Sequence, residues 1–273
     1  MPLDRLLHLF GLRPKAVTYG HRAAELRLPK DGDVEFVQWL HPLEKTKVIT
    51  QEQVDACRTF LRPGDVALDV GAHTGISTIP VALAVGAQGA VLAFEPNSYV
   101  FPILELNAQR NRDRTNILPF CFAAAPEDGL MEFEYSDPGY HSGGRHEGVS
   151  RWKHGRAFRL EVQGVQLEPY LRARHPDLVQ RIRYLKISAE GYVLPLLLSL
   201  RDLVALLKPY VRVEFYEHQD PERRVRIFEF FERMSYRIYR MRSDTGYRDE
   251  PLTRLDVERH KSFDAFAVPP GAS

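Results

Sequence analysis

Val66-Ala-Leu-Asp69-Val-Gly71-Ala-His73-Thr-Gly75, followed by Val91-Leu-Ala-Phe-Glu95-Pro96-Asn97, is the stretch of sequence that decides the fold. Residues 66–70 are apolar except for one aspartate, as expected of a parallel strand that is covered on both faces. The two glycines carry no Cβ, so the backbone can turn tightly there and pass close to a ligand. A second apolar strand ends in Glu95, which lies 20 residues after Gly75. This spacing is typical of a nucleotide-binding half-fold with a ribose-binding acid.

The glycine pattern indicates which nucleotide binds. A dinucleotide fingerprint reads G-x-G-x-x-G, but His73 stands where the second glycine belongs. Asp69, two residues before the first glycine, is unfavourable beside a diphosphate. The chain contains no G-x-x-x-x-G-K-[ST] phosphate loop either. An acid followed by these spaced glycines suits a ligand that has no phosphate and carries a cationic amine and a sulfonium, so we expect S-adenosylmethionine as the cofactor.

Length and composition set the class of protein. A chain of 273 residues with 44% hydrophobic residues can form one large α/β domain or a domain with a modest extra lobe. Its 37 Lys and Arg balance 36 Asp and Glu, so we expect no nucleic-acid partner. The two cysteines show no metal spacing, and no signal peptide or bilayer-spanning run is recognisable. We therefore expect a reduced, cytoplasmic protein without a transmembrane segment, and we leave a homo-oligomer open.

Strand and helix patterns alternate along most of the chain. We predict a helix at residues 3–10 and a β-hairpin at 23–40, which together form an N-terminal cap (residues 1–49) packed on a core domain (residues 50–273). Within the core we predict helices at 51–61, 76–85, 98–111, 194–207 and 222–234, and strands at 66–70, 90–94, 117–123, 182–187, 210–216, 236–241 and 262–268. This alternation implies an α/β fold: a mostly parallel sheet with helices on both faces and a ligand at the carboxyl ends of its strands.

Residues 130–166 interrupt the alternation. Two strand-like runs, 131–135 and 158–162, flank a loop rich in glycine and polar residues. Long loops of this kind inside a compact domain are usually functional or disordered. We expect residues 136–157 to form a lid over the substrate, with His141 and His146 as candidate substrate contacts. Solvation of a surface loop is the alternative explanation for both histidines.

Six segments match one pattern in their order and spacing. They are residues 68–75, 93–97, 104–111, 185–191, 208–214 and 262–269. On these segments the chain resembles the FkbM family of S-adenosylmethionine-dependent methyltransferases, within the class I methyltransferase fold, from about residue 60 to its end. The resemblance implies a Rossmann-like sheet of seven strands with an antiparallel C-terminal hairpin. It also implies methyl transfer to a hydroxyl of a small molecule such as a sugar or a polyketide.

The chain departs from the family pattern at four positions. Ser188 replaces the aspartate of the fourth-strand motif and Val193 replaces an acid just beyond it. His73 replaces an asparagine, and Pro126 replaces an acid that follows the third strand. The cofactor half of the pattern therefore transfers better than the substrate half. A cofactor-binding protein without transfer activity, acting as a partner or regulator, is the alternative, while the missing glycine disfavours a nicotinamide dehydrogenase.

The cofactor is expected along the turn from Gly71 to Gly75, called the glycine corner below, and at the end of the second strand. Asp69 would favour the cationic methionine end of the cofactor, or it caps the following turn. Glu95 would accept both ribose hydroxyls, at about 1.5–3 kcal/mol for a charge-assisted hydrogen bond, or it is a surface acid. The other expected contacts are Gly71, Ala72, His73, Thr74, Gly75, Pro96, Asn97, Phe122 and Ala123. For Phe122, a role in the apolar core explains the residue equally well.

Methyl transfer to a hydroxyl requires a base within hydrogen-bond reach of the acceptor. Glu190 and Lys186 match retained positions of the fourth-strand motif, and His218 follows the fifth strand, so these three are the candidate catalytic residues. A structural acceptor is the alternative for Glu190 and a surface histidine is the alternative for His218. Ser188 is a candidate substrate contact that cannot act as an anionic base. No ligand spacing supports a metal site.

Overall fold

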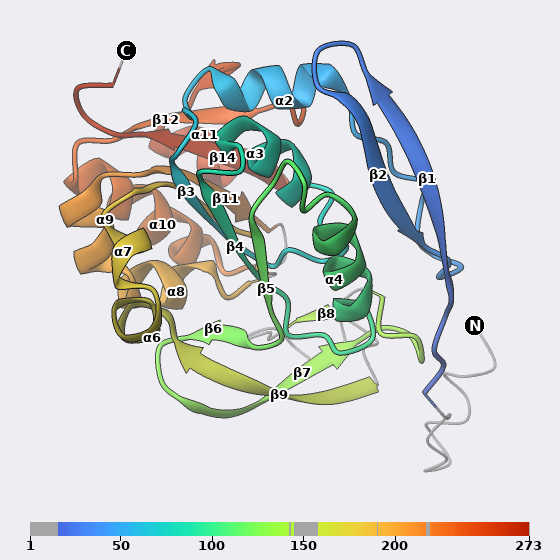
Figure 1. Cartoon of the computed structure of the whole chain (residues 1–273). Coiled ribbons are helices and arrows are strands. Elements are labelled where there is room, and N and C mark those ends of the chain that lie inside the picture. The colour runs from blue at the N-terminus through green and yellow to red at the C-terminus, as the bar shows by residue number, and fades with distance from the viewer. Residues whose placement is uncertain (1–15, 142, 145–157, 190, 217–218, 273) are drawn as a thin grey trace, which may run out of the picture.

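The protein is described by a computed structural model that covers residues 16–141, 143–144, 158–189, 191–216 and 219–272 (Figure 1). It consists of a large sheet between two layers of helices, a smaller second sheet and a separate β-hairpin. The helix predicted at residues 3–10 and most of the predicted lid lie outside the described residues.

Within the described residues, the main sheet has eight strands in the order β13-β12-β14-β11-β10-β3-β4-β5. The strands β11, β10, β3, β4 and β5 run parallel to one another. The bounds are β3 (Val66–Val70), β4 (Ala90–Phe94), β5 (Ile117–Phe120), β10 (Ile182–Ile187), β11 (Tyr210–Phe215), β12 (Arg237–Met241), β13 (Glu250–Pro251) and β14 (Phe263–Val268). The chain thus has the predicted α/β fold with a mostly parallel sheet.

Two details of the predicted sheet are wrong. The two-residue strand β13 pairs with β12 and makes an eighth strand, where seven were expected. The last two long strands, β12 and β14, are antiparallel neighbours but form no hairpin, because β13 and helix α11 (Arg254–Arg259) separate them in sequence. Strand β14 lies between β11 and β12 and is antiparallel to both.

Side chains of the parallel strands alternate between two hydrophobic cores. On β3, Val66, Leu68 and Val70 belong to one core and Ala67 belongs to the other. The first core contains residues of helices α8 (Val193–Ser199), α9 (Arg201–Leu207) and α10 (Pro221–Arg233), and the second contains residues of α2 (Gln51–Arg58), α3 (Thr78–Val85) and α4 (Phe101–Arg110). Because successive side chains of a strand point to opposite faces, Asp69 is directed to the same side as Ala67, toward α3.

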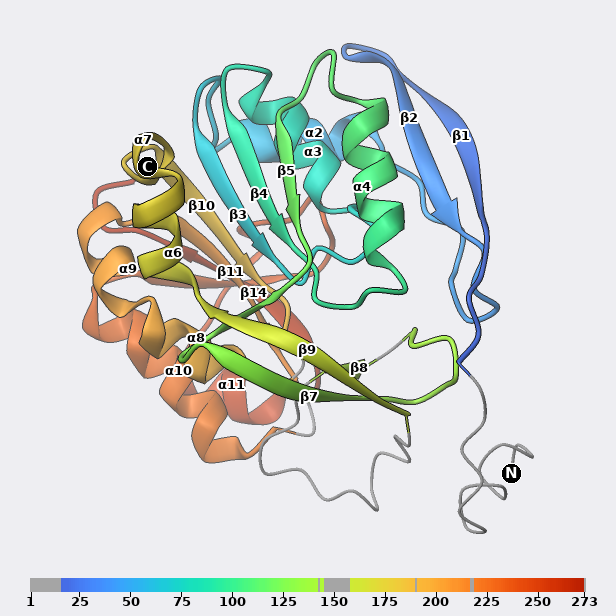
Figure 2. The ribbon, with the colours of Figure 1, turned by 60° about the horizontal axis from the view of Figure 1, so that its bottom comes forward.

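The helices form one layer on each face of the main sheet (Figure 2). Helices α2 (Gln51–Arg58), α3 (Thr78–Val85) and α4 (Phe101–Arg110) cover one face, and α8 (Val193–Ser199), α9 (Arg201–Leu207) and α10 (Pro221–Arg233) cover the other. Thr50 is the N-cap of helix α2 and forms a capping box with Gln53. The single helix predicted at residues 194–207 is two helices that meet at Leu200. Helices α6 (Leu167–Arg174) and α7 (Pro176–Val179) were not predicted.

The second sheet lies below the carboxyl ends of the parallel strands (Figures 1 and 2). Its order is β6-β9-β7-β8, with bounds β6 (Ala123–Ala125), β7 (Gly129–Tyr135), β8 (Gly143–Gly144) and β9 (Phe158–Gln166). The strand predicted at residues 117–123 ends at Phe120, because the chain then leaves the main sheet and pairs with β9 as β6. The strand-like runs at 131–135 and 158–162 are confirmed as parts of β7 and β9.

The predicted hairpin is confirmed as strands β1 (His21–Leu28) and β2 (Gly32–Trp39). It stands beside helix α4 (Figure 1). Asn107 of α4 joins the two, because its amide accepts the N–H of Val37 at 2.7 Å and donates to the carbonyl of Val37 at 3.2 Å. The same amide nitrogen donates to the carbonyl of Thr74 at 2.7 Å, so one side chain links the hairpin to the glycine corner.

Candidate functional site

The glycine corner, between β3 and α3, packs closely against the end of β10. Gly71 has φ +78°, and a Cβ there would stand 2.1 Å from the backbone oxygen of Ser188, so no other residue fits without moving the backbone. Gly75 has φ +86° and lies against the side chain of Leu104. His73 also adopts a positive φ of 51°, which is uncommon for a residue other than glycine. The corner therefore exposes backbone groups at the carboxyl edge of the sheet.

A cavity of about 350 Å³ opens at this edge, where the parallel strands end and the second sheet begins. Its walls come from the corner, from residues that follow β4 and β10, from Glu214 of β11, from the second sheet and from the segment 44–47. The predicted site residues that it brings together are Gly71, His73, Glu95, Pro96, Asn97, Ala123, His141 and Ser188.

Glu95 is a buried carboxylate at the wall of this first cavity. Its side chain accepts the backbone N–H of His73 at 2.7 Å and that of Asn97 at 2.9 Å. The residue is 7% exposed, and burial raises the pKa of its carboxyl to about 7 although the two backbone hydrogen bonds oppose the shift. Since a carboxylate has about four lone-pair sites, two acceptor positions remain after these backbone bonds.

Asp69 and Lys186 form a buried ion pair beneath the corner. The Lys186 ammonium donates to Asp69 at 2.7 Å and to the carbonyl of Gly71 at 2.9 Å. The second oxygen of Asp69 accepts the hydroxyls of Ser77 at 3.0 Å and of Thr78 at 2.7 Å. Asp69 lines neither the first cavity nor the second one described next. Its carboxylate holds Lys186 and the first turn of α3, which is the structural role that the sequence left open.

A second cavity of about 240 Å³ lies between the corner, α2 and strands β10 and β11. It is lined by Ala72 and Ser77 from the corner side and by Lys186 and Arg212 from the sheet. Arg212 is paired with Asp264 and, at 2.8 Å, with Asp244. The two cavities share four lining residues, which are Lys47, Gly71, His73 and Ser188. An elongated ligand can therefore lie across the corner with one end in each cavity.

The remaining predicted residues have different positions. Thr74 is buried, and its hydroxyl accepts the Lys47 ammonium at 3.3 Å. Phe122 lines neither of the two cavities and packs against Phe94 and Tyr170, with ring centroids 5.4 and 5.0 Å away. Gly75 shapes the corner without lining a cavity. Glu190, His218 and His146 lie outside the described residues.

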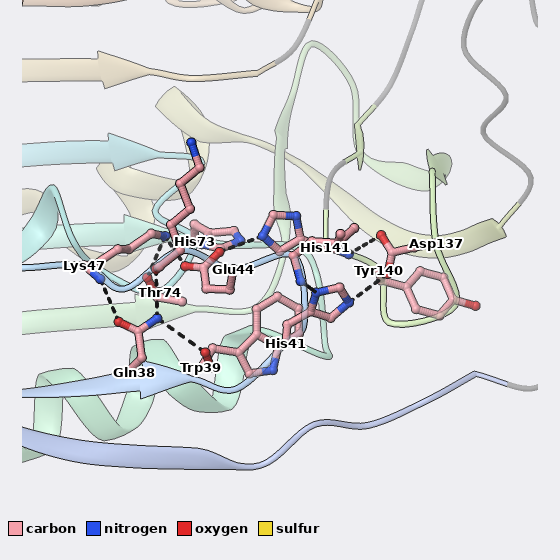
Figure 3. Close-up of polar contacts among 12 residues, drawn as sticks. Gln38, Trp39, His41, Glu44, Lys47, His73, Thr74, Asp137, Tyr140 and His141 are labelled. Carbon is pink, nitrogen blue, oxygen red and sulfur yellow. Dashed lines mark hydrogen bonds and ion pairs between the residues drawn. The ribbon is translucent and has the colours of Figure 1, made fainter. Parts of the chain in front are cut away.

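The segment that follows the hairpin contributes site residues that no sequence motif indicates (Figure 3). Glu44 lines the first cavity with a side chain that is 3% exposed, and it pairs with Lys47 and with His141, whose Nε2 lies 2.6 Å away. Burial alone would raise the pKa of Glu44, but the hydrogen bonds from His141 and Lys47 outweigh it and lower the pKa to about 2. No spacing rule points to Glu44, because its partner is 97 residues away in the chain.

His73 is half-buried in the same group. Burial and the neighbouring Lys47 ammonium lower the pKa of its imidazole to about 3, so the ring is neutral. Lys47 lies 3.3 Å from Nδ1 of this ring, which fits a neutral tautomer that accepts at Nδ1. His73 thus adds a neutral imidazole to the wall that the two cavities share.

Two features are absent from the described residues. In this part of the chain, no three or more His, Cys, Asp or Glu side chains are grouped so as to hold a metal ion. Nor does any helix in the described ranges have the length and apolar character needed to cross a bilayer.

The strand order defines a Rossmann-like fold, and the cavity lies at the carboxyl ends of its strands, where such folds usually bind a ligand. A sequence profile described as the methyltransferase FkbM domain matches residues 69–241, and the chain belongs to this methyltransferase family. A comparison with curated proteins found no significant match.

Several solved structures resemble this one, at low sequence identity. The methyltransferase FkbM from Methylobacillus flagellatus KT is 13% identical, with 80% of this chain and 51% of that protein covered and a TM-score of 0.46. The chain thus spans about half the length of that protein. A SAM-dependent O-methyltransferase from Thermotoga maritima is 12% identical over 98% of this chain and 82% of that one, with a TM-score of 0.42. A precorrin-6y C5,15-methyltransferase from Geobacter metallireducens GS-15 is 13% identical over 82% and 92%, also with a TM-score of 0.42.

Proposed function

We propose that this protein transfers a methyl group from S-adenosylmethionine to a hydroxyl of a small molecule such as a sugar or a polyketide. The observation that carries the cofactor half of the proposal is Glu95. A carboxylate that is 7% exposed, held by two backbone N–H groups and placed on a cavity wall after the second parallel strand is suited to accept a pair of ribose hydroxyls. The family to which the chain belongs supports the methyl-transfer half.

The two cavities divide the cofactor between them in this proposal. The adenosine would lie in the first cavity, with its ribose on Glu95 and its adenine beside Pro96 and Ala123. The methionine end would cross Gly71 into the second cavity, where Lys186 adds positive charge near its carboxylate. Gly71 lines both cavities, so a ligand that extends from one cavity to the other would pass its backbone.

The chain's own residues would do the work of positioning. When bound, S-adenosylmethionine supplies a methyl group that is activated by the sulfonium for an in-line displacement. Glu95 would fix the ribose and the corner would fix the chain that carries the sulfur, so that the methyl group faces the rest of the first cavity. Holding the reacting atoms in line in this way is the main catalytic contribution available to a protein in such a reaction.

Calorimetry with S-adenosylhomocysteine tests the cofactor site on the full chain. We expect binding, and we expect Glu95→Gln to weaken it about tenfold or more, because a charge-assisted hydrogen bond is lost. Glu105→Gln on the exposed side of α4 is the matched control, since it makes the same chemical change away from both cavities. Tight binding of NAD together with no binding of S-adenosylhomocysteine would overturn the proposal.

Transfer of a tritiated methyl group tests the reaction. The wild-type protein and Glu95→Gln would be incubated with labelled S-adenosylmethionine and a panel of sugars, polyketides and amines. We expect label on hydroxyl compounds with the wild-type protein and much less with the variant. Label on amines alone would replace oxygen by nitrogen as the acceptor atom, and cofactor binding without transfer to any compound would support the binding-protein alternative.

A further inference from the structure

Two imidazole–carboxylate pairs lie next to each other beside the first cavity (Figure 3). His141 is 2.6 Å from Glu44, and His41 is 2.8 Å from Asp137. The two imidazoles stack with their centroids 4.8 Å apart and their planes 24° apart. Of the two pairs, the one formed by Glu44 and His141 lines the cavity, whereas His41 and Asp137 do not. The pairs therefore have matched chemistry but different access to a ligand.

The pair on the cavity wall has the components of a general base. Glu44 is ionised, because the hydrogen bonds from His141 and Lys47 outweigh its burial and hold its pKa near 2. An anionic carboxylate bonded to one nitrogen of an imidazole orients the ring and stabilises the imidazolium that forms when the ring takes a proton. The ring of His141 is further positioned by Trp39, which stacks on it at 5.9 Å and 16°.

The other ionisable groups on this wall are less suited to the task. His73 is too weak a base, because burial and Lys47 bring its pKa to about 3. The Glu95 carboxylate is assigned to the ribose in the proposed function. Glu214 accepts the hydroxyl of Ser188 at 3.3 Å and is the rival candidate on the strand side of the cavity. His141 is the remaining imidazole among the described lining residues.

We propose that His141, held by Glu44, binds the acceptor hydroxyl and takes its proton during methyl transfer; this inference rests on the function proposed above. The acceptor oxygen forms a bond to the methyl carbon, the electrons of the carbon–sulfur bond stay on sulfur, and the hydroxyl proton goes to the imidazole of His141. Among the described residues, Glu44, His41 and His73 are titratable groups that face this ring, and Asp137 accepts its backbone N–H at 3.0 Å.

A pair of cofactor analogues tests this inference although the acceptor is unidentified. In both analogues a nitrogen replaces the sulfur of S-adenosylmethionine; one carries a 2-hydroxyethyl group in place of the methyl group and the other carries a propyl group. The hydroxyl then lies about where the attacking oxygen would be. With the wild-type protein at pH 8, we expect the hydroxyethyl analogue to bind about fivefold more tightly than the propyl analogue, as for one net hydrogen bond.

The variants assign that preference to a residue. His141→Gln and Glu44→Gln should reduce the ratio of the two affinities to about one while S-adenosylhomocysteine still binds within about twofold of the wild-type affinity. His41→Gln is the matched control and should keep the ratio, since His41 does not line the cavity.

Each outcome decides between the two proposals. If S-adenosylhomocysteine does not bind the wild-type protein, the proposed function fails and the inference fails with it. If S-adenosylhomocysteine binds but the wild-type protein binds the two analogues equally well, the inference is overturned while the cofactor site stands. The same holds if His141→Gln keeps the preference for the hydroxyethyl analogue, or if only Glu214→Gln loses it. If the histidine variants do not fold, NMR of the imidazole signals of the wild-type protein replaces them. The signals of His141 should then shift more with the hydroxyethyl analogue than with the propyl analogue. Equal shifts would overturn the inference.

Discussion

At the scale of single residues, Glu95 combines burial with two backbone N–H donors, and burial prevails: its pKa rises to about 7. The carboxyl therefore keeps its proton until near neutral pH in the absence of a ligand. Ribose hydroxyls donate to a carboxylate better than to a neutral acid. In the proposed site, cofactor binding and ionisation of Glu95 are consequently linked.

This linkage predicts a pH dependence of cofactor affinity. A carboxyl with a pKa of about 7 is roughly one-tenth ionised at pH 6 and nine-tenths ionised at pH 8, so the affinity for S-adenosylhomocysteine should rise about tenfold between these values. Calorimetry at several pH values measures this rise. Glu95→Gln should bind weakly with no such slope, and Glu105→Gln should keep the slope. An affinity that falls as the pH increases would contradict the assignment of Glu95.

The ion pair of Asp69 with Lys186 predicts a loss of stability. Asp69→Asn leaves the Lys186 ammonium buried without its counter-charge, and such a change costs about 3 kcal/mol of the free energy of unfolding. Urea unfolding measures it. Adding Lys186→Met to the same chain should recover a large part of the loss, because the uncompensated charge is removed. A double variant no more stable than Asp69→Asn would show that the ion pair is not the cause.

At the scale of elements, helix α4 connects the hairpin to the glycine corner. Asn107 is fully buried and bonds both to Val37 of β2 and to the carbonyl of Thr74 in the corner. Asn111, one turn further on, accepts the backbone N–H of Glu35 of β2 and donates to the carbonyl of the same residue. Within the described residues it has no hydrogen bond to the corner. The two asparagines therefore separate attachment of the hairpin from support of the site.

The different contacts of Asn107 and Asn111 predict different effects on the binding of S-adenosylhomocysteine. Asn107→Ala and Asn111→Ala should each lower the free energy of unfolding by about 1–3 kcal/mol, because each leaves backbone groups of β2 without partners, buried at Val37 and half-buried at Glu35. Asn107→Ala should also weaken S-adenosylhomocysteine binding several-fold, since the corner loses its support, whereas Asn111→Ala should leave binding unchanged. Urea unfolding and calorimetry on the same samples measure both quantities. Equal effects on binding would mean that α4 acts only through overall stability.

At the scale of the whole molecule, the site is assembled from parts that are far apart in the sequence. The main sheet supplies the corner and Glu95, the second sheet and its loop supply His141, and the segment after the hairpin supplies Glu44 and Lys47. A ligand that spans these parts stabilises all of them together, because it binds the folded chain and not the unfolded one.

The expected size of that stabilisation follows from mass action. S-adenosylhomocysteine at a hundred times its Kd should raise the free energy of unfolding by about 2.7 kcal/mol. Urea unfolding with and without the ligand measures this as a shift of the midpoint at an unchanged slope. NAD at the same concentration serves as the control and should give no shift. A stabilisation by NAD but not by S-adenosylhomocysteine would contradict the proposed cofactor.

The sequence by itself determined the elements with strong local signals. The strands at 66–70 and 90–94 are found where periodicity places them. The corner and Glu95 were identified because glycine geometry and the spacing of a βαβ unit are properties of one short segment. These features depend on neighbours in the chain, so the order of residues is enough to find them.

Only the tertiary structure decided the features that depend on distant partners. The position of β14 between β11 and β12, and the crossing of the chain into the second sheet after Phe120, follow from which strands pair. The Asp69 carboxylate bonds to α3 and to Lys186, because the packing of the folded chain places both partners on that face of the sheet. The pair of Glu44 and His141 joins residues 97 positions apart, and neither residue carries a local sign of the other. Side-chain partners of this kind are set by the packing of whole elements, and only the folded chain reveals them.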